Sequence, residues 1–212
     1  MARLFVAIEI PQALASALLA RVPRVAGIRS ATLNQIHLTL HFLGEQDEAT
    51  AMRIEQALGT VSCAAFALTV REAGYFRGRR ASVLWAGVES NAALDDLHAG
   101  VERALAGSGI GMGGIGGMGM GHDESNALPD SGSQPQARFQ TRFHPHITLA
   151  RCTPAVADGT LQAWRGSQSG LVCEPFHVDR FILYQSHLLP GGAQHVCRRA
   201  YALDTSEDPP AG

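Results

Sequence analysis

One short motif occurs twice in this chain and limits both its fold and its chemistry. Residues 37–40 read HLTL, and residues 146–149 read HITL. Alternate side chains of a β-strand point to opposite faces, so each copy places a histidine and a threonine on one face and two apolar residues on the other. Two such strands lying side by side would bring four polar side chains together at one site: His37, Thr39, His146 and Thr148.

Histidine and threonine in this arrangement are suited to acid–base chemistry on a phosphate. The pKa of an unperturbed histidine is about 6.5, so near neutral pH one ring can be neutral while another is protonated. A pair of histidines can therefore supply a general base and a general acid, each contributing on the order of 10²–10⁴-fold in rate. Threonine hydroxyls can donate hydrogen bonds to phosphate oxygens. An internally strained phosphate would need no metal for this reaction.

The sequence around both motifs resembles the two signatures of the bacterial and archaeal RNA 2′,3′-cyclic phosphodiesterases. This family also carries the name 2′-5′ RNA ligase and belongs to the 2H phosphoesterases. The resemblance covers the chain from about Arg3 to Leu203, apart from one insertion. Six segments carry it: residues 3–8, 37–45, 83–87, 143–151, 183–186 and 190–192. The chain departs from the family in the loop at 76–82, which lacks a proline common there, and at Gln194-His195, where a tyrosine is common.

The resemblance implies an α+β fold with two pseudo-symmetric lobes of antiparallel sheet and helices, and a cleft between the lobes. It further implies that an RNA or oligonucleotide 3′ end carrying a 2′,3′-cyclic phosphate is hydrolysed to a 2′-phosphate. In that reaction His37 would be the proton donor and His146 the proton acceptor, with Thr39 and Thr148 beside them. Ligation of 2′-5′ ends would be the reverse reaction and is expected to be minor.

Two arginines are candidates for contacting the substrate. Arg151 follows the second motif, where the family also has an arginine. Strict alternation sends Arg151 to the face opposite His146, so it reaches the site only if the strand ends or twists at Ala150. Arg77 begins an arginine-rich loop, which is either a solvated surface or a rim for the RNA backbone.

Three aromatic residues are candidates for stacking on a nucleobase, because aromatic faces bind bases with little sequence preference. Packing in the core is the alternative for each of them. They are Phe42, Trp85 and Tyr184.

The remaining histidines raise the question of a metal. On regular strands His41 would share a face with His37, and His144 with His146, so four imidazoles could form a zinc site. No acidic or cysteine ligand recurs in both motifs, and the threonines would have no role there. The sequence therefore predicts no metal and no cofactor. His195 is grouped with the other histidines, at the surface or in local hydrogen bonds.

Composition limits the partners and the compartment. The net charge of −2 argues against extensive, sequence-independent binding of duplex nucleic acid. All 17 basic residues are arginine. The four cysteines show no C-x-x-C spacing, and neither a signal segment nor a membrane-length apolar run is seen. We expect a cytoplasmic monomer with reduced thiols, no membrane contact and no obligate protein partner.

Alternating strand and helix patterns predict one domain over residues 1–204. Expected helices cover 11–22, 47–58, 92–106 and 155–164. Expected strands cover 3–10, 37–42, 66–73, 82–88, 146–150, 176–186 and 195–203. Residues 107–137 form a Gly/Met-rich segment expected to be a flexible insertion, and 205–212 are expected to be a disordered tail.

Two other functions stay open from the sequence. The same site could open the cyclic phosphate of a small nucleotide, such as an ADP-ribose derivative. The chain could also be a non-catalytic module that binds RNA ends, although a binder does not need a pair of histidines for proton transfer.

Overall fold

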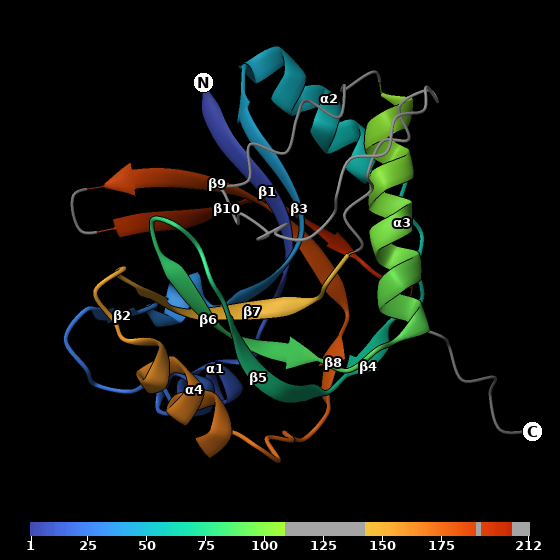
Figure 1. Cartoon of the computed structure of the whole chain (residues 1–212). Coiled ribbons are helices and arrows are strands. Elements are labelled where there is room, and N and C mark those ends of the chain that lie inside the picture. Colours follow the sequence, from blue (N-terminus) through green and yellow to red (C-terminus); the bar gives the residue numbers. More distant parts are fainter. Residues whose placement is uncertain (109–142, 190–191, 205–212) are drawn as a thin grey trace, which may run out of the picture.

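A computed structural model describes residues 1–108, 143–189 and 192–204 (Figure 1). Within these residues the chain forms ten strands, four α-helices and one short 3₁₀-helix. In chain order the elements are β1 (Ala2–Glu9), α1 (Gln12–Leu19), β2 (Ile28–Ser30), η1 (Leu33–Gln35), β3 (His37–Gln46), α2 (Glu48–Leu58), β4 (Phe66–Leu68), β5 (Val70–Phe76), β6 (Ser82–Val88), α3 (Ala92–Gly107), β7 (His146–Cys152), α4 (Asp158–Ser167), β8 (Phe176–Val178), β9 (Arg180–Leu189) and β10 (Gly192–Ala202).

Eight strands form one sheet, in the order β10-β9-β1-β3-β7-β6-β5 with β2 beside β7, while β4 and β8 form a separate pair. The pairings between these strands are antiparallel, which confirms the predicted α+β class. The two halves of the large sheet meet at β3 and β7, where the ladder consists of one pair, Leu38 opposite Ile147. This narrow junction divides the sheet into two lobes.

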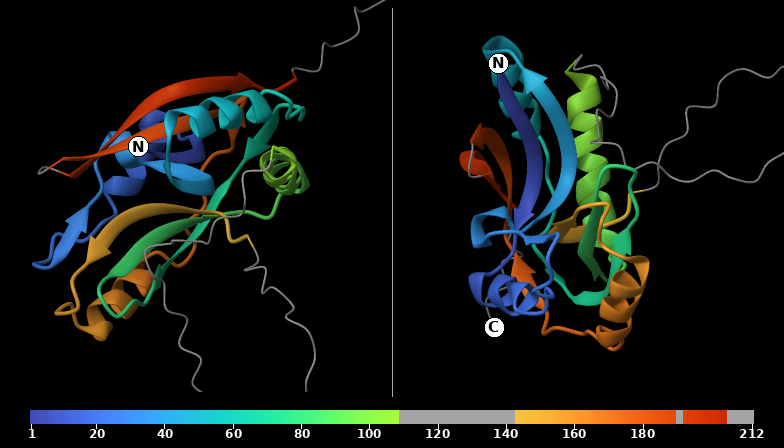
Figure 2. Two further views of the ribbon diagram at one scale, coloured as in Figure 1. Left: turned by 90° about the horizontal axis from the view of Figure 1, so that it is seen from above. Right: turned by 60° about the vertical axis from the view of Figure 1, so that its left-hand side comes forward.

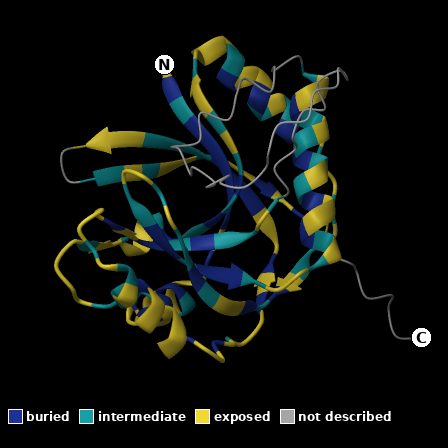
Figure 3. Ribbon diagram, in the orientation of Figure 1, coloured by how far each residue is buried: buried dark blue, intermediate teal, exposed yellow. Residues whose placement is uncertain are grey.

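The helices are grouped on the two lobes (Figures 1 and 2). Helices α2 and α3 pack on each other, α2 also contacts β1, and α3 contacts β3. Helix α4 contacts β5, and the indole N–H of its Trp164 donates to the carbonyl of Arg21, just after α1. The core fills the space between these layers, where much of the ribbon is coloured as buried (Figure 3). Its side chains include Ile54, Leu97 and Leu38, each at 0% exposure.

The helix starts follow from local capping. The carboxylate of Asp47 accepts a hydrogen bond from the backbone N–H of Thr50 at the start of α2. The side-chain oxygen of Asn91 accepts from the N–H groups of Ala93 and Leu94 at the start of α3. Such residues satisfy N–H groups that have no partner inside the helix. The predicted starts of these two helices are therefore confirmed.

A β-bulge interrupts β3 just after the first motif. Ala7 of β1 lies opposite Thr39, whereas its neighbour Val6 lies opposite His41, so Leu40 is an extra residue. A bulge shifts the alternation of side chains by one position. The strand continues to Gln46, beyond the predicted end at residue 42, and a second register shift leaves Leu43 as an extra residue just before Gly44, which has φ 70°.

The second motif strand has the same irregularity. Trp85 of β6 lies opposite Thr148, whereas Leu84 lies opposite Ala150, so Leu149 is the extra residue. The pattern of two buried residues in succession, Leu149 and Ala150, marks the place where the alternation changes.

Two sequence predictions concern segments that are largely outside the described residues. Gly107, the first residue of the expected insertion, is the last residue of α3. The stretch 109–137 and the tail 205–212 lie outside the description. Among the residues that are described, no helix is both long and apolar enough to cross a membrane.

Candidate active site

The junction of the two lobes brings both motifs to one place. Leu38 and Ile147 face each other and are 0% exposed, so both point into the core. Their sequence neighbours therefore point to the opposite face of the sheet, where they are partly buried. These neighbours are His37, Thr39, His146 and Thr148.

Both motif histidines are held by the backbone in the same way. Nδ1 of His146 lies 2.8 Å from the carbonyl oxygen of His144, to which it donates. The ring of His37 likewise donates to the carbonyl of Gln35, again two residues before it in the chain. Each bond fixes the ring and its tautomer, and leaves the other ring nitrogen available for proton transfer.

Aromatic rings surround His37. The ring centroid of Phe5 lies 4.9 Å from that of His37, and the ring of Tyr184 stacks on Phe5 at 5.2 Å. The Tyr184 hydroxyl donates to Glu9 at 3.0 Å, and burial together with Glu9 raises the pKa of this phenol. The first half-site is thus a rigid apolar wall with one imidazole set against it.

His146 has a similar wall. The ring centroid of Phe76 lies 5.1 Å from that of His146, and Trp85 stacks on Phe76 at 5.2 Å. His144 contacts the same two aromatic rings, and its centroid lies 6.2 Å from that of His146. Each half-site therefore pairs one motif histidine with two stacked aromatic rings, one on the adjacent strand and one on the next.

The apolar surroundings change the acid–base behaviour of the site. Burial, reinforced by the nearby rings of His195 and His146, lowers the pKa of His37 to about 3. Burial also lowers the pKa of His146 and that of His195. All three imidazoles are consequently neutral at pH 7 in the unliganded protein. A phosphodiester anion bound between them would raise their pKa values, because a nearby negative charge favours the protonated form.

His195 is a site residue that sequence reasoning missed. It lies on β10, and its ring centroid is 5.3 Å from that of His37 and 4.9 Å from that of Phe5. Its Nδ1 is buried without a hydrogen-bond partner in the part of the chain that the structure describes. The grouping of His195 with surface histidines is therefore wrong. The available signal was the departure from the family at Gln194-His195, where a tyrosine is common.

The four imidazoles that the alternative of a zinc site at the motifs would need do not meet, because His41 lies elsewhere. The bulge at Leu40 turns His41 away from His37 and toward α3, where its charge interactions are with His98 and Glu102. His144 alone joins His146, as predicted.

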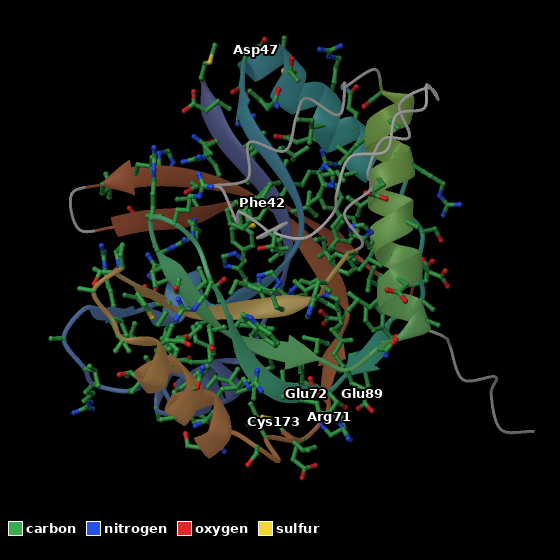
Figure 4. The ribbon with its side chains drawn as sticks, viewed as in Figure 1. Phe42, Asp47, Arg71, Glu72, Glu89 and Cys173 are labelled. Atoms are coloured by element: carbon green, nitrogen blue, oxygen red, sulfur yellow. The ribbon has the colours of Figure 1, made fainter. Side chains whose placement is uncertain are left out.

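The two bulges place Phe42 and Arg151 on the site face. Ala150 and Cys152 are 1% exposed and belong to the core, so Arg151 between them points the other way and is exposed. The bulge at Leu149 thus changes the strict alternation that would have sent Arg151 to the core face. The side chain of Phe42 is labelled in Figure 4. It is 67% exposed, and its ring centroid lies 6.2 Å from that of Phe5.

Arg77 and Trp85, the other two residues predicted to contact the substrate, are engaged in contacts with other parts of the protein. The guanidinium of Arg77 forms an ion pair with Asp158 at the start of α4. Trp85 lies flat on β5, where an added Cβ on Gly74 would be 2.4 Å from its ring. The indole Nε1 of Trp85 is buried, and no described residue bonds to it. Trp85 therefore packs in the wall of the second half-site.

A two-lobed antiparallel α+β fold with a histidine–threonine pair from each lobe defines a class of phosphate-handling proteins. Comparison with known families agrees with this interpretation. The model of the 2′-5′ RNA ligase superfamily matches residues 10–188, and the chain belongs to that superfamily.

Individual relatives and structures are similar over different lengths. An RNA 2′,3′-cyclic phosphodiesterase of Thermotoga maritima is 28% identical over 162 residues, which is 74% of this chain and 70% of that protein. An RNA 2′,3′-cyclic phosphodiesterase of Aeropyrum pernix is 31% identical over 117 residues, which is 54% of this chain and 52% of that protein. A solved phosphoesterase structure superposes with a TM-score of 0.66 at 25% identity, covering 96% of this chain and 99% of that one. The structure of E. coli LigT shares the fold. It superposes with a TM-score of 0.66 at 23% identity, covering 95% of this chain and 97% of that one.

Proposed function

We propose that this protein hydrolyses the 2′,3′-cyclic phosphate at an RNA 3′ end to a 2′-phosphate. The observation that supports this most directly is the convergence of two backbone-anchored imidazoles on one face of the β3–β7 junction. The named activity of the Thermotoga maritima and Aeropyrum pernix relatives agrees with it.

In the proposed reaction His146 is the base and His37 is the acid. The free nitrogen of neutral His146 takes a proton from water, and the water oxygen forms a bond to phosphorus. The bond between phosphorus and O3′ breaks, and His37 gives its proton to O3′. The product carries a 2′-phosphate and a 3′-hydroxyl, and the two histidines exchange protons through solvent. A bound phosphate would raise the pKa of His37 and so favour the protonated form that the acid role requires.

The remaining groups of the site would bind the phosphate and the terminal nucleoside. Thr39 and Thr148 share the face of the histidines and can donate hydrogen bonds to the non-bridging oxygens. Arg151, exposed on that face, would neutralise the charge that develops on the phosphate. Phe42 is exposed beside the first half-site and is the aromatic ring best placed to stack on a base, while Tyr184, whose ring centroid lies 6.3 Å from that of His37, would form part of the wall. Arg77 would act only at the rim, because Asp158 already pairs with it.

We also propose that the protein works as a cytoplasmic monomer and that 2′-5′ ligation, the reverse reaction, is minor. All four cysteines are free in the structure, as expected in a reducing compartment.

The decisive experiment compares three substrates at equal concentration with EDTA present. They are a 5′-labelled oligoribonucleotide ending in a 2′,3′-cyclic phosphate, a mononucleoside 2′,3′-cyclic phosphate and an ADP-ribose cyclic phosphate. We expect the oligonucleotide to have the highest kcat/KM and to yield a 2′-phosphate only. A higher kcat/KM for either small nucleotide would identify the protein instead as a cyclic phosphodiesterase of small nucleotides. Binding of the RNA end without turnover would show a non-catalytic module.

A further inference from the structure

We propose that His41, His98 and Glu102 form a binding site for a Zn²⁺-class dication behind the sheet, separate from the active site. His41 lies on β3, and the other two residues lie one helical turn apart on α3. The site would therefore connect the first motif strand to the helix that covers it.

The geometry fits a metal with three protein ligands. One donor atom from each residue lies within 4.8 Å of the others, and Nδ1 of His98 is 3.9 Å from Oε2 of Glu102. Tetrahedral zinc bound at about 2.0–2.1 Å keeps its ligand atoms about 3.3 Å apart, so modest side-chain rotation closes the set. All three residues are partly exposed, which gives the ion a path and leaves a position for water. Two imidazoles with one carboxylate are a donor set that zinc accepts.

The surroundings of His98 support this assignment. Its ring donates a hydrogen bond to the backbone carbonyl of Leu40 and stacks on Phe143 at 3.9 Å. Histidines that bind metals usually direct their second ring nitrogen to a carbonyl or carboxylate, which fixes the tautomer and the ring orientation. Asp95, about one turn before His98 on α3, adds negative charge near the ring. A cation thus meets a pre-oriented ring in a negatively charged environment.

The same contacts give the site a structural consequence. Leu40 is the extra residue of the bulge, and the bulge is what directs His41 to α3 and Phe42 to the catalytic face. A metal held by His41 and α3 would fix this bulge from behind. The role is structural, because the ligands lie on the opposite side of the sheet from His37.

The test is a zinc titration of the full chain after removal of metals with a chelator. Competition with a chromophoric chelator would be measured for the wild type, His98→Gln and Glu102→Gln. Two matched controls remove a histidine elsewhere: His177→Gln, at an exposed position on β8, and His37→Gln, in the active site. We expect one Zn²⁺ per chain in the wild type and both controls, and affinity lower by at least about 10–100-fold in the other two variants.

A second readout is thermal unfolding. Zinc at about one hundred times its Kd should raise the Tm of the wild type by about 5–10 °C, and the shift should be absent in Glu102→Gln. This variant keeps both histidines, so it reports on the site even if His98→Gln folds poorly. Equal zinc affinity in the wild type and Glu102→Gln would overturn the proposal. Loss of zinc binding in His37→Gln would also overturn it, because the ion would then lie at the active site.

Discussion

Leu40 and Leu149 occupy equivalent places in the two half-sites: each is the fourth residue of its motif and the extra residue of a β-bulge. The likeness of the two halves therefore continues beyond the repeated tetrapeptide. After the bulge, His41 and Ala150 turn away from the site, and Phe42 and Arg151 turn toward it. One lobe thus presents an aromatic ring and the other a cation at the same position relative to the bulge.

Replacing either motif histidine should nearly abolish turnover. We expect His37→Ala and His146→Ala each to lower kcat by about 10²–10⁴-fold, because each removes one of the two proton transfers. The double variant should be little worse than the singles, since the two groups act as a unit. Steady-state kinetics on the cyclic-phosphate oligonucleotide would measure this, with circular dichroism to verify folding and His177→Ala as the control. Retention of a tenth of the wild-type rate by either single variant would rule out the two-histidine mechanism.

Turnover should depend on pH in a specific direction. The reaction needs one protonated and one neutral imidazole, and the pKa values of His37 and His146 are both lowered in the unliganded protein. Above both values the protonated fraction falls about tenfold per pH unit, so kcat/KM should decrease on the alkaline side from below about pH 6.5. Because the bound phosphate raises both pKa values, the alkaline limb of kcat should lie at higher pH than that of kcat/KM. A kcat/KM that is flat from about pH 6 to 8 would contradict this.

Replacement of Arg151 should lower kcat/KM more than replacement of other exposed arginines. A charge-assisted hydrogen bond to the phosphate contributes about 1.5–3 kcal/mol, so Arg151→Ala should lower kcat/KM by about 10–100-fold. Arg151→Lys should recover part of the loss, because it restores the charge but not the paired donors. Arg24→Ala, at an exposed position in the loop before β2, is the matched control and should be neutral. Equal kinetics of the Arg151 and Arg24 alanine variants would show that the bulge does not direct Arg151 to the substrate.

Removal of metal ions with EDTA should affect thermal stability without affecting the rate of the reaction. The proposed proton transfers use imidazoles only, so EDTA should leave kcat unchanged. If the site at His41, His98 and Glu102 holds zinc, the same treatment should lower the Tm. Parallel activity and thermal-unfolding measurements on one EDTA-treated sample would show both effects. Loss of kcat that zinc restores would mean that the metal takes part in the reaction.

Gly74 should be essential for packing the second half-site. A Cβ at this position would lie 2.4 Å from the Trp85 ring, so Gly74→Ala must displace the indole or the strand. We expect a loss of about 1–3 kcal/mol in unfolding free energy. Gly166 in α4 has nothing within 4 Å of an added Cβ, so Gly166→Ala should be neutral or stabilising by up to about 1 kcal/mol. Urea unfolding of both variants makes the comparison, and equal stability of the two would refute the packing argument.

Much of the fold could be predicted from the sequence because it depends on near neighbours in the chain. Period-two alternation placed Leu38 and Ile147 in the core and the motif histidines on the other face. The expected helices 47–58 and 92–106 begin within one residue of α2 and α3, where Asp47 and Asn91 cap the next few N–H groups. These features need no knowledge of what packs against them.

Tertiary structure decided what lies around the paired histidines. A bulge depends on the register with a neighbouring strand, so strict alternation misplaced His41 and left Arg151 undecided until β1 and β6 were in place. His195 reaches His37 only because β9 and β10 pair beside β1, a contact between residues far apart in the chain. Local periodicity depends only on neighbouring residues of the chain, whereas cross-strand register and long-range strand pairing depend on how the whole sheet packs.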